Sequence, residues 1–261
     1  MANIDKHAPG SFCWIELGTT DQNAAKTFYT SLFGWTVQDF PMGPDQTYSM
    51  FGLDTRNVGG GYTLQPEMRA AGVPPHWMLY IAVESADASA AKAKDLGAKV
   101  EAGPFDVYTF GRMAVLHDPT GAAVSLWQPL SHPGIGIAGV PGTLCWADLM
   151  TPDSAAAKKF YEGLFGWKVE PGEHDTSGYL HIKNGEQFIG GMPPAMPNPN
   201  APPHWLLYFL VENCDTATSK ASGLGAKVFV QPMSMEGVGR WSVIADPQDA
   251  VFALFQPLEH K

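Results

Sequence analysis

The sequence predicts an α+β protein of 261 residues in which one domain plan occurs twice. PGSFCWIEL at residues 9–17 returns as PGTLCWADL at 141–149, and PPHW at 74–77 returns at 202–205. A shorter echo lies inside each half, where a strand is followed by a polar capping residue and a helix. We therefore expect four modules, each a strand, a helix and three strands, that pair into two domains of ordinary size.

The sequence of the first half predicts a succession of strands and helices. Residues 12–17 alternate after a Pro-Gly pair and predict the opening strand. Asp21 then caps a helix that runs to about Phe33 and ends at Gly34. The next predicted elements are strands at 35–39, 48–53 and 58–64, a strand beginning at His76, a helix at 86–96, and strands near 98–101, 112–117 and 123–128. The triplet Gly59-Gly60-Gly61 indicates a bulge or a close backbone approach in one of these strands.

The second half repeats the plan after a short Gly-rich stretch. We expect a first domain at 1–130, a linker at 131–140 and a second domain at 141–261. The clearest predicted elements of the second domain are a strand at 144–149, helices at 153–165 and 216–224, a strand at 204–211, and a final hairpin turning at 246–249.

Composition excludes several classes of protein. The formal charge is −10 and no Lys/Arg cluster occurs, which argues against binding nucleic acid or an anionic membrane. No apolar run approaches the roughly 18 residues of a membrane span, and no signal-peptide core precedes residue 10, so we expect a cytoplasmic protein. Three cysteines, Cys13, Cys145 and Cys214, cannot form a disulfide framework. We expect the protein to be a monomer or a homodimer and to bind a small molecule.

Several landmarks together resemble the vicinal oxygen chelate superfamily of glyoxalases, bleomycin-resistance proteins and extradiol dioxygenases. They are the opening strand, the helix from Asp21 with Phe28-Tyr29, LFGW at 32–35, LGAKV at 96–100 and DPTG at 118–121, and similar elements recur in the second half. Among its members, the chain is similar to two-domain glyoxalase-like proteins of actinobacteria that are often labelled hydroxylases. The resemblance implies paired βαβββ modules whose sheet curls around a cup.

The resemblance also implies where a metal would bind. Metal-dependent members carry His and Glu ligands at positions that correspond here to Trp14, to Met78 or Tyr80, and to Ser125. The counterparts in the second half are Trp146, Leu206 or Tyr208, and Ala253. Trp lacks a suitable lone pair, and Ser and Met are poor ligands for hard divalent ions. We therefore expect no metal at these positions and no other cofactor.

Glu16 and Asp148 are the candidate catalytic residues. They are repeat equivalents, and strand alternation places them on the same face as Trp14 and Trp146. A carboxylate in a half-apolar cup has a raised pKa and can act as an acid or a base. The alternative is a structural carboxylate paired with Arg112 or Arg240, or hydrogen-bonded across the module interface.

The candidate substrate-binding residues flank these carboxylates, namely Trp14, His76 and Tyr80 in the first half and Trp146, His204 and Tyr208 in the second. Tyrosine offers a hydroxyl and an aromatic wall to a small carbonyl or aromatic ligand. Each has an alternative role: a histidine can tie down its loop through a backbone bond, and a core tyrosine can bond to Glu16 or Asp148. A relocated metal site, such as Glu16 with His76, is a further alternative.

Four hypotheses follow for function. The first is a glyoxalase-like protein that binds or transforms a small carbonyl or aromatic compound in its cups, with the enzyme class (lyase, isomerase, or hydroxylase- or dioxygenase-like) left open. The second is a metal-independent sequestering protein of the bleomycin-resistance type, and the third is a metal-dependent lyase or dioxygenase with relocated ligands. The fourth is that side chains fill the cups and the fold is kept for an interaction.

Overall fold

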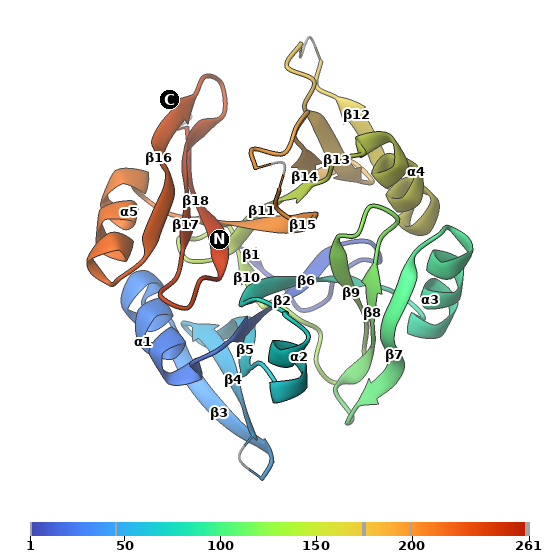
Figure 1. Ribbon diagram of the computed structural model, residues 1–261, viewed down its shortest axis with the longest axis horizontal. Helices are drawn as coiled ribbons and strands as arrows, with labels where there is room; N and C mark the ends of the chain where they lie inside the picture. Colours follow the sequence, from blue (N-terminus) through green and yellow to red (C-terminus); the bar gives the residue numbers. More distant parts are fainter. Residues whose placement is uncertain (1, 45, 174–175, 199, 259–261) are drawn as a thin grey trace.

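The computed structural model describes residues 2–44, 46–173, 176–198 and 200–258, and it confirms the duplicated α+β fold (Figure 1). Each half forms one eight-stranded sheet. The elements of the first half are β2 (Phe12–Thr19), α1 (Gln22–Phe33), β3 (Thr36–Gly43), β4 (Gln46–Leu53), β5 (Arg56–Thr63), α2 (Pro66–Ala70), β6 (His76–Ala82), α3 (Ala86–Asp95), β7 (Lys99–Val107), β8 (Gly111–His117) and β9 (Ala123–Pro129).

In the residues described, the second half repeats this order without a counterpart of α2. Its elements are β11 (Leu144–Met150), α4 (Ser154–Phe165), β12 (Lys168–Pro171), β13 (Leu180–Asn184), β14 (Gln187–Met192), β15 (His204–Leu210), α5 (Cys214–Gly223), β16 (Lys227–Met235), β17 (Gly239–Ala245) and β18 (Val251–Pro257). Two short strands, β1 (Ala2–Asn3) and β10 (Ile137–Ala138), pair with each other outside the large sheets.

Each sheet joins its two modules at the centre. The strand order of the first sheet is β3-β4-β5-β2-β6-β9-β8-β7, and that of the second is β12-β13-β14-β11-β15-β18-β17-β16. The opening strand β2 lies parallel to β5 and antiparallel to β6, and β11 lies likewise between β14 and β15. This pairing sets Trp14 opposite Tyr80 and Trp146 opposite Tyr208.

Local chemistry explains the helix boundaries. The Asp21 carboxylate accepts a hydrogen bond from the backbone N–H of Ala24 at 3.0 Å, and Gly34 ends α1 with φ of 73°. The last helix begins at Cys214, two residues earlier than expected, because the Asn213 side chain accepts from the N–H of Thr216 and caps it there. The short helix α2 lies between β5 and β6, where no helix was predicted.

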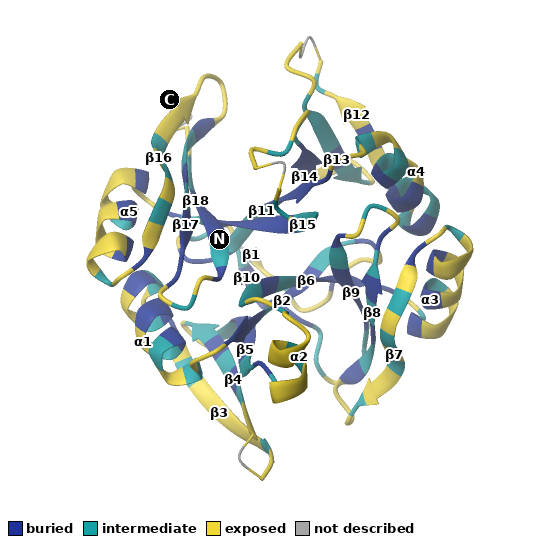
Figure 2. Cartoon of the chain, viewed as in Figure 1, coloured by how far each residue is buried: buried dark blue, intermediate teal, exposed yellow. Residues whose placement is uncertain are grey.

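The edge strands are longer than their sequences suggest. Strand β7 runs to Val107 and β3 to Gly43, whereas strands ending near 101 and 39 were expected. Both strands pair on one side only and remain largely exposed, so the apolar alternation that marks a half-buried strand fades along them (Figure 2). Hydrogen bonding to β4 and β8 maintains them beyond that point.

The two halves pack through equivalent contacts. Helix α1 lies beside α5 and helix α3 beside α4, so each half contributes a helix to the other's flank (Figure 1). The Tyr29 hydroxyl of α1 donates to Asp246 of the second half at 2.9 Å, and the Tyr161 hydroxyl of α4 donates to Asp118 of the first half at 3.0 Å. One large hydrophobic core therefore includes side chains of both halves. No helix among the described residues is long and apolar enough to cross a membrane.

Candidate functional site

We define the cup face of each sheet as the face turned away from the helices. Trp77 marks the helix side of β6, because its indole N–H donates to the hydroxyl of Tyr29 in α1 at 2.9 Å. Trp77 lies opposite Leu17, so the neighbouring residues Glu16 and Met78 point to the other face. The cup face of the first sheet therefore carries Glu16 and its alternation partner Trp14.

The first cup is centred on Glu16. The Tyr80 hydroxyl donates to the Glu16 carboxylate at 2.7 Å, and the Trp14 indole N–H donates to the Tyr48 hydroxyl at 3.1 Å. Tyr48 reaches this position because Gly60, which lies opposite Glu16 on β5, has no side chain: a Cβ there would overlap the Tyr48 hydroxyl. A close backbone approach was expected at the glycine triplet. At Gly60 the approaching group is instead a tyrosine side chain, whereas at Gly59 an added Cβ would lie 3.1 Å from the backbone oxygen of Ile15.

The second cup repeats this centre around Asp148. The carboxylate accepts hydrogen bonds from the Trp146 indole at 3.0 Å, the Tyr208 hydroxyl at 2.8 Å and the Tyr179 hydroxyl at 2.5 Å. Trp146 also donates to Tyr179 at 2.9 Å. Gly191 lies opposite Asp148 and leaves room for Tyr179, as Gly60 does for Tyr48. Each cup therefore holds one carboxylate, one tryptophan and two tyrosines in matching places.

Burial governs the electrostatics of both centres. Desolvation raises the pKa of Glu16, and hydrogen bonds from Tyr80 and Tyr48 oppose that shift. Desolvation likewise raises the pKa of Asp148, against the hydrogen bonds from Tyr179, Tyr208 and Trp146. Both carboxyl groups therefore keep their protons to a higher pH than ordinary side chains of their type.

Unpartnered polar atoms gather at the cups. Five buried side-chain nitrogen or oxygen atoms have no hydrogen-bond partner among the described residues, and four of them belong to cup residues. In the first cup they are Ser125 Oγ, opposite Tyr80, and His132 Nε2, whose ring lies 4.6 Å from that of Trp14. In the second cup they are His181 Nδ1 and Trp241 Nε1. Such atoms are uncommon in folded proteins and call for an explanation, such as a partner outside the protein.

His76 and His204 lie at the ends of their strands. Each donates a hydrogen bond from Nδ1 to a backbone carbonyl of its own loop, that of Pro74 at 2.8 Å and that of Pro202 at 2.9 Å. This is the loop-tying contact considered from the sequence. His76 lies opposite Gly18, two residues beyond Glu16, and no hydrogen bond links it to that carboxylate.

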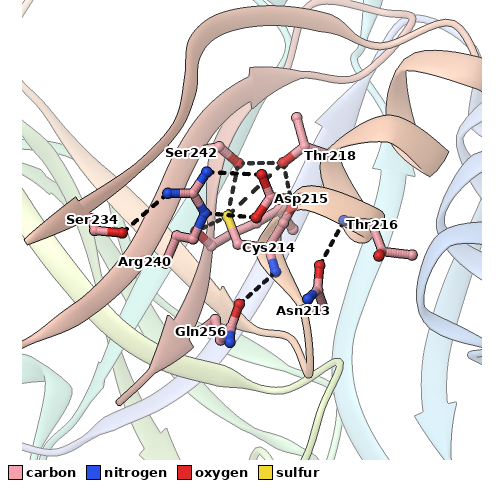
Figure 3. Close-up of polar contacts among 10 residues, drawn as sticks. Asn213, Cys214, Asp215, Thr216, Thr218, Ser234, Arg240, Ser242 and Gln256 are labelled. Atoms are coloured by element: carbon pink, nitrogen blue, oxygen red, sulfur yellow. Dashed lines mark hydrogen bonds and ion pairs between the residues drawn. The ribbon is translucent and has the colours of Figure 1, made fainter.

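Arg112 and Arg240 do not pair with the cup carboxylates. Arg240 binds Asp215 through two hydrogen bonds of 2.6 and 2.8 Å and also donates to Ser234, which ties β17 to α5 and β16 (Figure 3). Arg112 makes the same kind of contact with Asp87 and Asp106. Each arginine thus fixes the outer helix of its module to the hairpin beside it.

Cys214 belongs to the same outer network. Its thiol lies 3.6 Å from the Ser242 hydroxyl, which is in turn 2.7 Å from the Thr218 hydroxyl (Figure 3). A shallow groove beside it is lined by the polar residues Asp215, Thr218, Ser219, Ser222 and Gln231 together with Val228 and Pro232. Burial raises the pKa of the Cys214 thiol, so this cysteine is a poor nucleophile.

The donor set of the cups does not fit a divalent metal ion. Trp14, Tyr80 and Ser125 lie side by side on adjacent strands, in the register expected from the resemblance. In the residues that the structure describes, no three His, Cys, Asp or Glu side chains gather closely enough to hold an ion. Each cup has one carboxylate and one histidine, Glu16 with His132 and Asp148 with His181, and its other polar side chains include tyrosine and tryptophan, which are not the usual ligands.

Five cup residues were not identified from the sequence, namely Tyr48, His132, Tyr179, His181 and Trp241. The two tyrosines depend on the pairing of three strands, because β5 must place a glycine between the tyrosine and the carboxylate. A usable signal was present in the paired glycines Gly60 and Gly191, which fall at equivalent points of the repeat.

Comparison with known proteins agrees with the fold and the duplication. The family model described as Glyoxalase/Bleomycin resistance protein/Dioxygenase superfamily matches residues 11–126 and again residues 143–254. A Mycobacterium tuberculosis protein named "Putative glyoxylase CFP32" is 38% identical over 264 residues, covering 98% of both chains. The "Anthracycline biosynthesis protein DnrV" of Streptomyces peucetius is 32% identical over 267 residues, covering 97% of this chain and 95% of that protein.

Solved structures show the same architecture at low sequence identity. The Mn(II)-bound glyoxalase from Novosphingobium aromaticivorans superposes with a TM-score of 0.67 at 18% identity, covering 96% of this chain and 83% of that one. A variant of homoprotocatechuate 2,3-dioxygenase from B. fuscum gives a TM-score of 0.67 at 16% identity, covering 97% and 73%. At these identities the likeness concerns the fold alone.

Proposed function

Because the chain belongs to the Glyoxalase/Bleomycin resistance protein/Dioxygenase superfamily, we propose that it binds a small carbonyl or aromatic compound in its cups without a metal ion. The observation that carries this proposal is the repeated centre of one carboxylate, one tryptophan and two tyrosines on the cup face of both sheets. In this proposal Glu16 and Asp148, with the tyrosines bound to them, supply the polar contacts to the ligand.

The surroundings of these centres support a ligand that is largely apolar. Tyr208, Leu206, Met150 and Ala253 form a buried cluster in the second cup, against which Trp146, Trp241 and Phe255 pack while still half-exposed. Flat aromatic walls with a few polar groups are typical of small-molecule sites. His76 and His204, at the strand ends, are proposed to contact the ligand at the rim.

In the catalytic form of this function, the Glu16 and Asp148 carboxyl groups act as acid or base on the bound compound. A carboxyl group with a raised pKa still holds its proton at a pH where an ordinary one has lost it, and once ionised it is the stronger proton acceptor. The tyrosine and tryptophan hydrogen bonds hold it in one orientation, which is what a positioned acid or base requires. A purely sequestering role uses the same contacts without the proton transfer. A relative named for anthracycline biosynthesis supports an aromatic ligand.

Native mass spectrometry combined with elemental analysis tests the proposal. The purified chain is incubated with a panel of phenols, aryl ketones and dicarbonyl compounds, in parallel with Glu16→Gln, Asp148→Asn and the double variant. We expect complexes of the unmodified chain with one or two ligands, no stoichiometric transition metal, and loss of binding in the double variant. Unchanged binding by the double variant, or one transition metal per half whose removal by chelation abolishes binding, contradicts the proposal.

A further inference from the structure

At two matching positions, a polar aromatic residue of the second cup replaces a methionine of the first. His181 lies opposite Gly191 in the second cup, whereas Met50 lies opposite the equivalent Gly60 in the first. Trp241 lies opposite Phe255 on the last strand pair, whereas Met113 lies opposite Trp127. At both positions, therefore, the second cup has a ring nitrogen where the first has a thioether.

Both of these nitrogens are unpaired in the described structure. His181 Nδ1 and Trp241 Nε1 are buried and have no hydrogen-bond partner among the described residues. Leaving a buried donor unpaired costs free energy, about 1–3 kcal/mol for each group. A methionine at the same place carries no such cost, as Met50 and Met113 illustrate in the first cup. The first cup has unpaired atoms of its own, Ser125 Oγ and His132 Nε2, but they lie at other positions. The two ring nitrogens of the second cup therefore point to a ligand of its own that pairs with them.

The hydrogen bonds already made in the second cup restrict what that ligand presents. Tyr179 and Tyr208 each give their hydroxyl proton to Asp148, so their oxygens retain only accepting capacity. The Trp241 indole can only donate. A ligand that pairs with both the tyrosine–carboxylate centre and Trp241 must donate a hydrogen bond to the centre and offer an acceptor oxygen to the Trp241 indole.

The aromatic side chains of the second cup and the negative charge of Asp148 further restrict the ligand. The His181 ring packs edge-on against Tyr179 and Trp146, at 5.0 and 6.4 Å between ring centroids, while Trp241 packs on the apolar cluster around Tyr208. Flat aromatic faces favour a planar ring between them. An anionic ligand is disfavoured beside Asp148 in a chain of net charge −10.

We propose that the second cup selects a neutral, planar aromatic ketone that bears a hydroxyl group, and that His181 and Trp241 are the residues that determine this selectivity. The assignment rests on the proposed function, since it presupposes that the cup binds a small molecule.

Three probe compounds of similar shape test the assignment in calorimetric titrations: 4′-hydroxyacetophenone, 4′-methoxyacetophenone and 4-ethylphenol. The first has both the donor and the acceptor, the second lacks the donor and the third lacks the ketone. We expect the unmodified chain to bind the hydroxy ketone about five- to tenfold more tightly than either of the others.

Matched variants separate the roles of the residues. Trp241→Phe keeps an aromatic ring without the N–H, so affinity for 4′-hydroxyacetophenone should fall about five- to tenfold while that for 4-ethylphenol stays unchanged. His181→Met, which copies the first cup, should likewise lower the affinity for the hydroxy ketone more than that for 4-ethylphenol. The control Tyr108→Phe, which removes an exposed hydroxyl between β7 and β8, should leave all three affinities unchanged.

The outcomes separate two kinds of failure. If the unmodified chain binds none of the three compounds, the proposed function itself fails and this assignment fails with it. If the chain binds them equally, or if Trp241→Phe and His181→Met are folded by thermal melting and preserve its preference, the cup function stands but the assignment is overturned.

Discussion

At the scale of residues, the centre of each cup combines features that are costly for folding. Asp148 is a carboxylate with 5% of its surface exposed, and its hydrogen-bond partners Trp146, Tyr179 and Tyr208 are neutral donors rather than cations. Neutral hydrogen bonds only partly offset the desolvation of the charge, which is why its pKa remains raised. Its contact with Tyr208 follows from strand alternation in the sequence. Its contact with Tyr179 does not, because that contact requires the register of β13 and β14.

The raised pKa of Asp148 has a consequence for stability. The folded state keeps the proton at a pH where the unfolded chain has already released it, so the wild-type chain loses stability as pH rises from the ordinary aspartate range through the raised value. Asp148→Asn has no proton to release at this site. We therefore expect the melting temperature of the variant minus that of the wild type to increase with pH over this window and then level off.

Melting curves of both proteins between about pH 3 and 8 check this expectation. The subtraction removes the titration of all other groups that the substitution leaves unaffected. A difference that decreases as pH rises would mean that the folded state favours the charged carboxylate, which is the opposite of a raised pKa.

At the scale of elements, the strands that carry clear periodicity were predicted and those that do not were missed or shortened. The opening strands, the helices α1 and α4 and the last hairpin of each half follow from alternation, capping residues and turn sequences. Strands β12 to β14 had no predicted bounds, because residues 168–192 have diverged from their counterparts in the first half. The location of Tyr179 was lost with that register, whereas Tyr48 lies in a predicted strand whose pairing with β5 was not predicted.

Strand β5 gives a direct test of how the first cup is built. A Cβ at Gly60 would overlap the Tyr48 hydroxyl, so Gly60→Ala must displace this tyrosine or the backbone of β5. We expect a loss of about 1–3 kcal/mol in the free energy of unfolding, as is usual for overpacking. Denaturant unfolding followed by fluorescence measures it.

The matched control lies on a helix. Gly223, the last residue of α5, has no atom within 4 Å of the position of an added Cβ, and Gly223→Ala should be neutral or slightly stabilising. Equal stability of Gly60→Ala and the wild type would show that Tyr48 is not held against β5.

At the scale of the whole molecule, duplication has produced two halves that depend on each other. Asp118 and Asp246 each close a hairpin turn by accepting backbone N–H bonds, from Thr120 and Gln248 respectively, and each also accepts from a tyrosine of the other half. The turn sequence was evident from the chain, but its docking onto a partner helix depends on the packing of the two sheets and was not.

Removing one of these tyrosine hydroxyls should weaken the whole molecule. Tyr29→Phe leaves the buried Asp246 oxygen and the Trp77 indole without this partner, and we expect a loss of about 1–3 kcal/mol in stability. Tyr161→Phe removes the equivalent contact to Asp118 and should have a similar effect. Chemical denaturation should show one cooperative transition in each case, because one core spans both halves.

The control for this pair is Tyr108→Phe. Tyr108 is 64% exposed, so removal of its hydroxyl should leave the free energy of unfolding nearly unchanged. Two separate transitions in the wild-type chain, one for each half, would contradict the picture of a shared core.

The central claim is that ligands bind at the cup centres around Glu16 and Asp148. A crystal structure of the chain in complex with 4′-hydroxyacetophenone tests it most directly. We expect the aromatic ring on the cup face of a sheet, with its hydroxyl within hydrogen-bonding distance of a tyrosine–carboxylate centre. Ligand density confined to the groove between α5 and β16, or to another surface away from both cup faces, would contradict the claim.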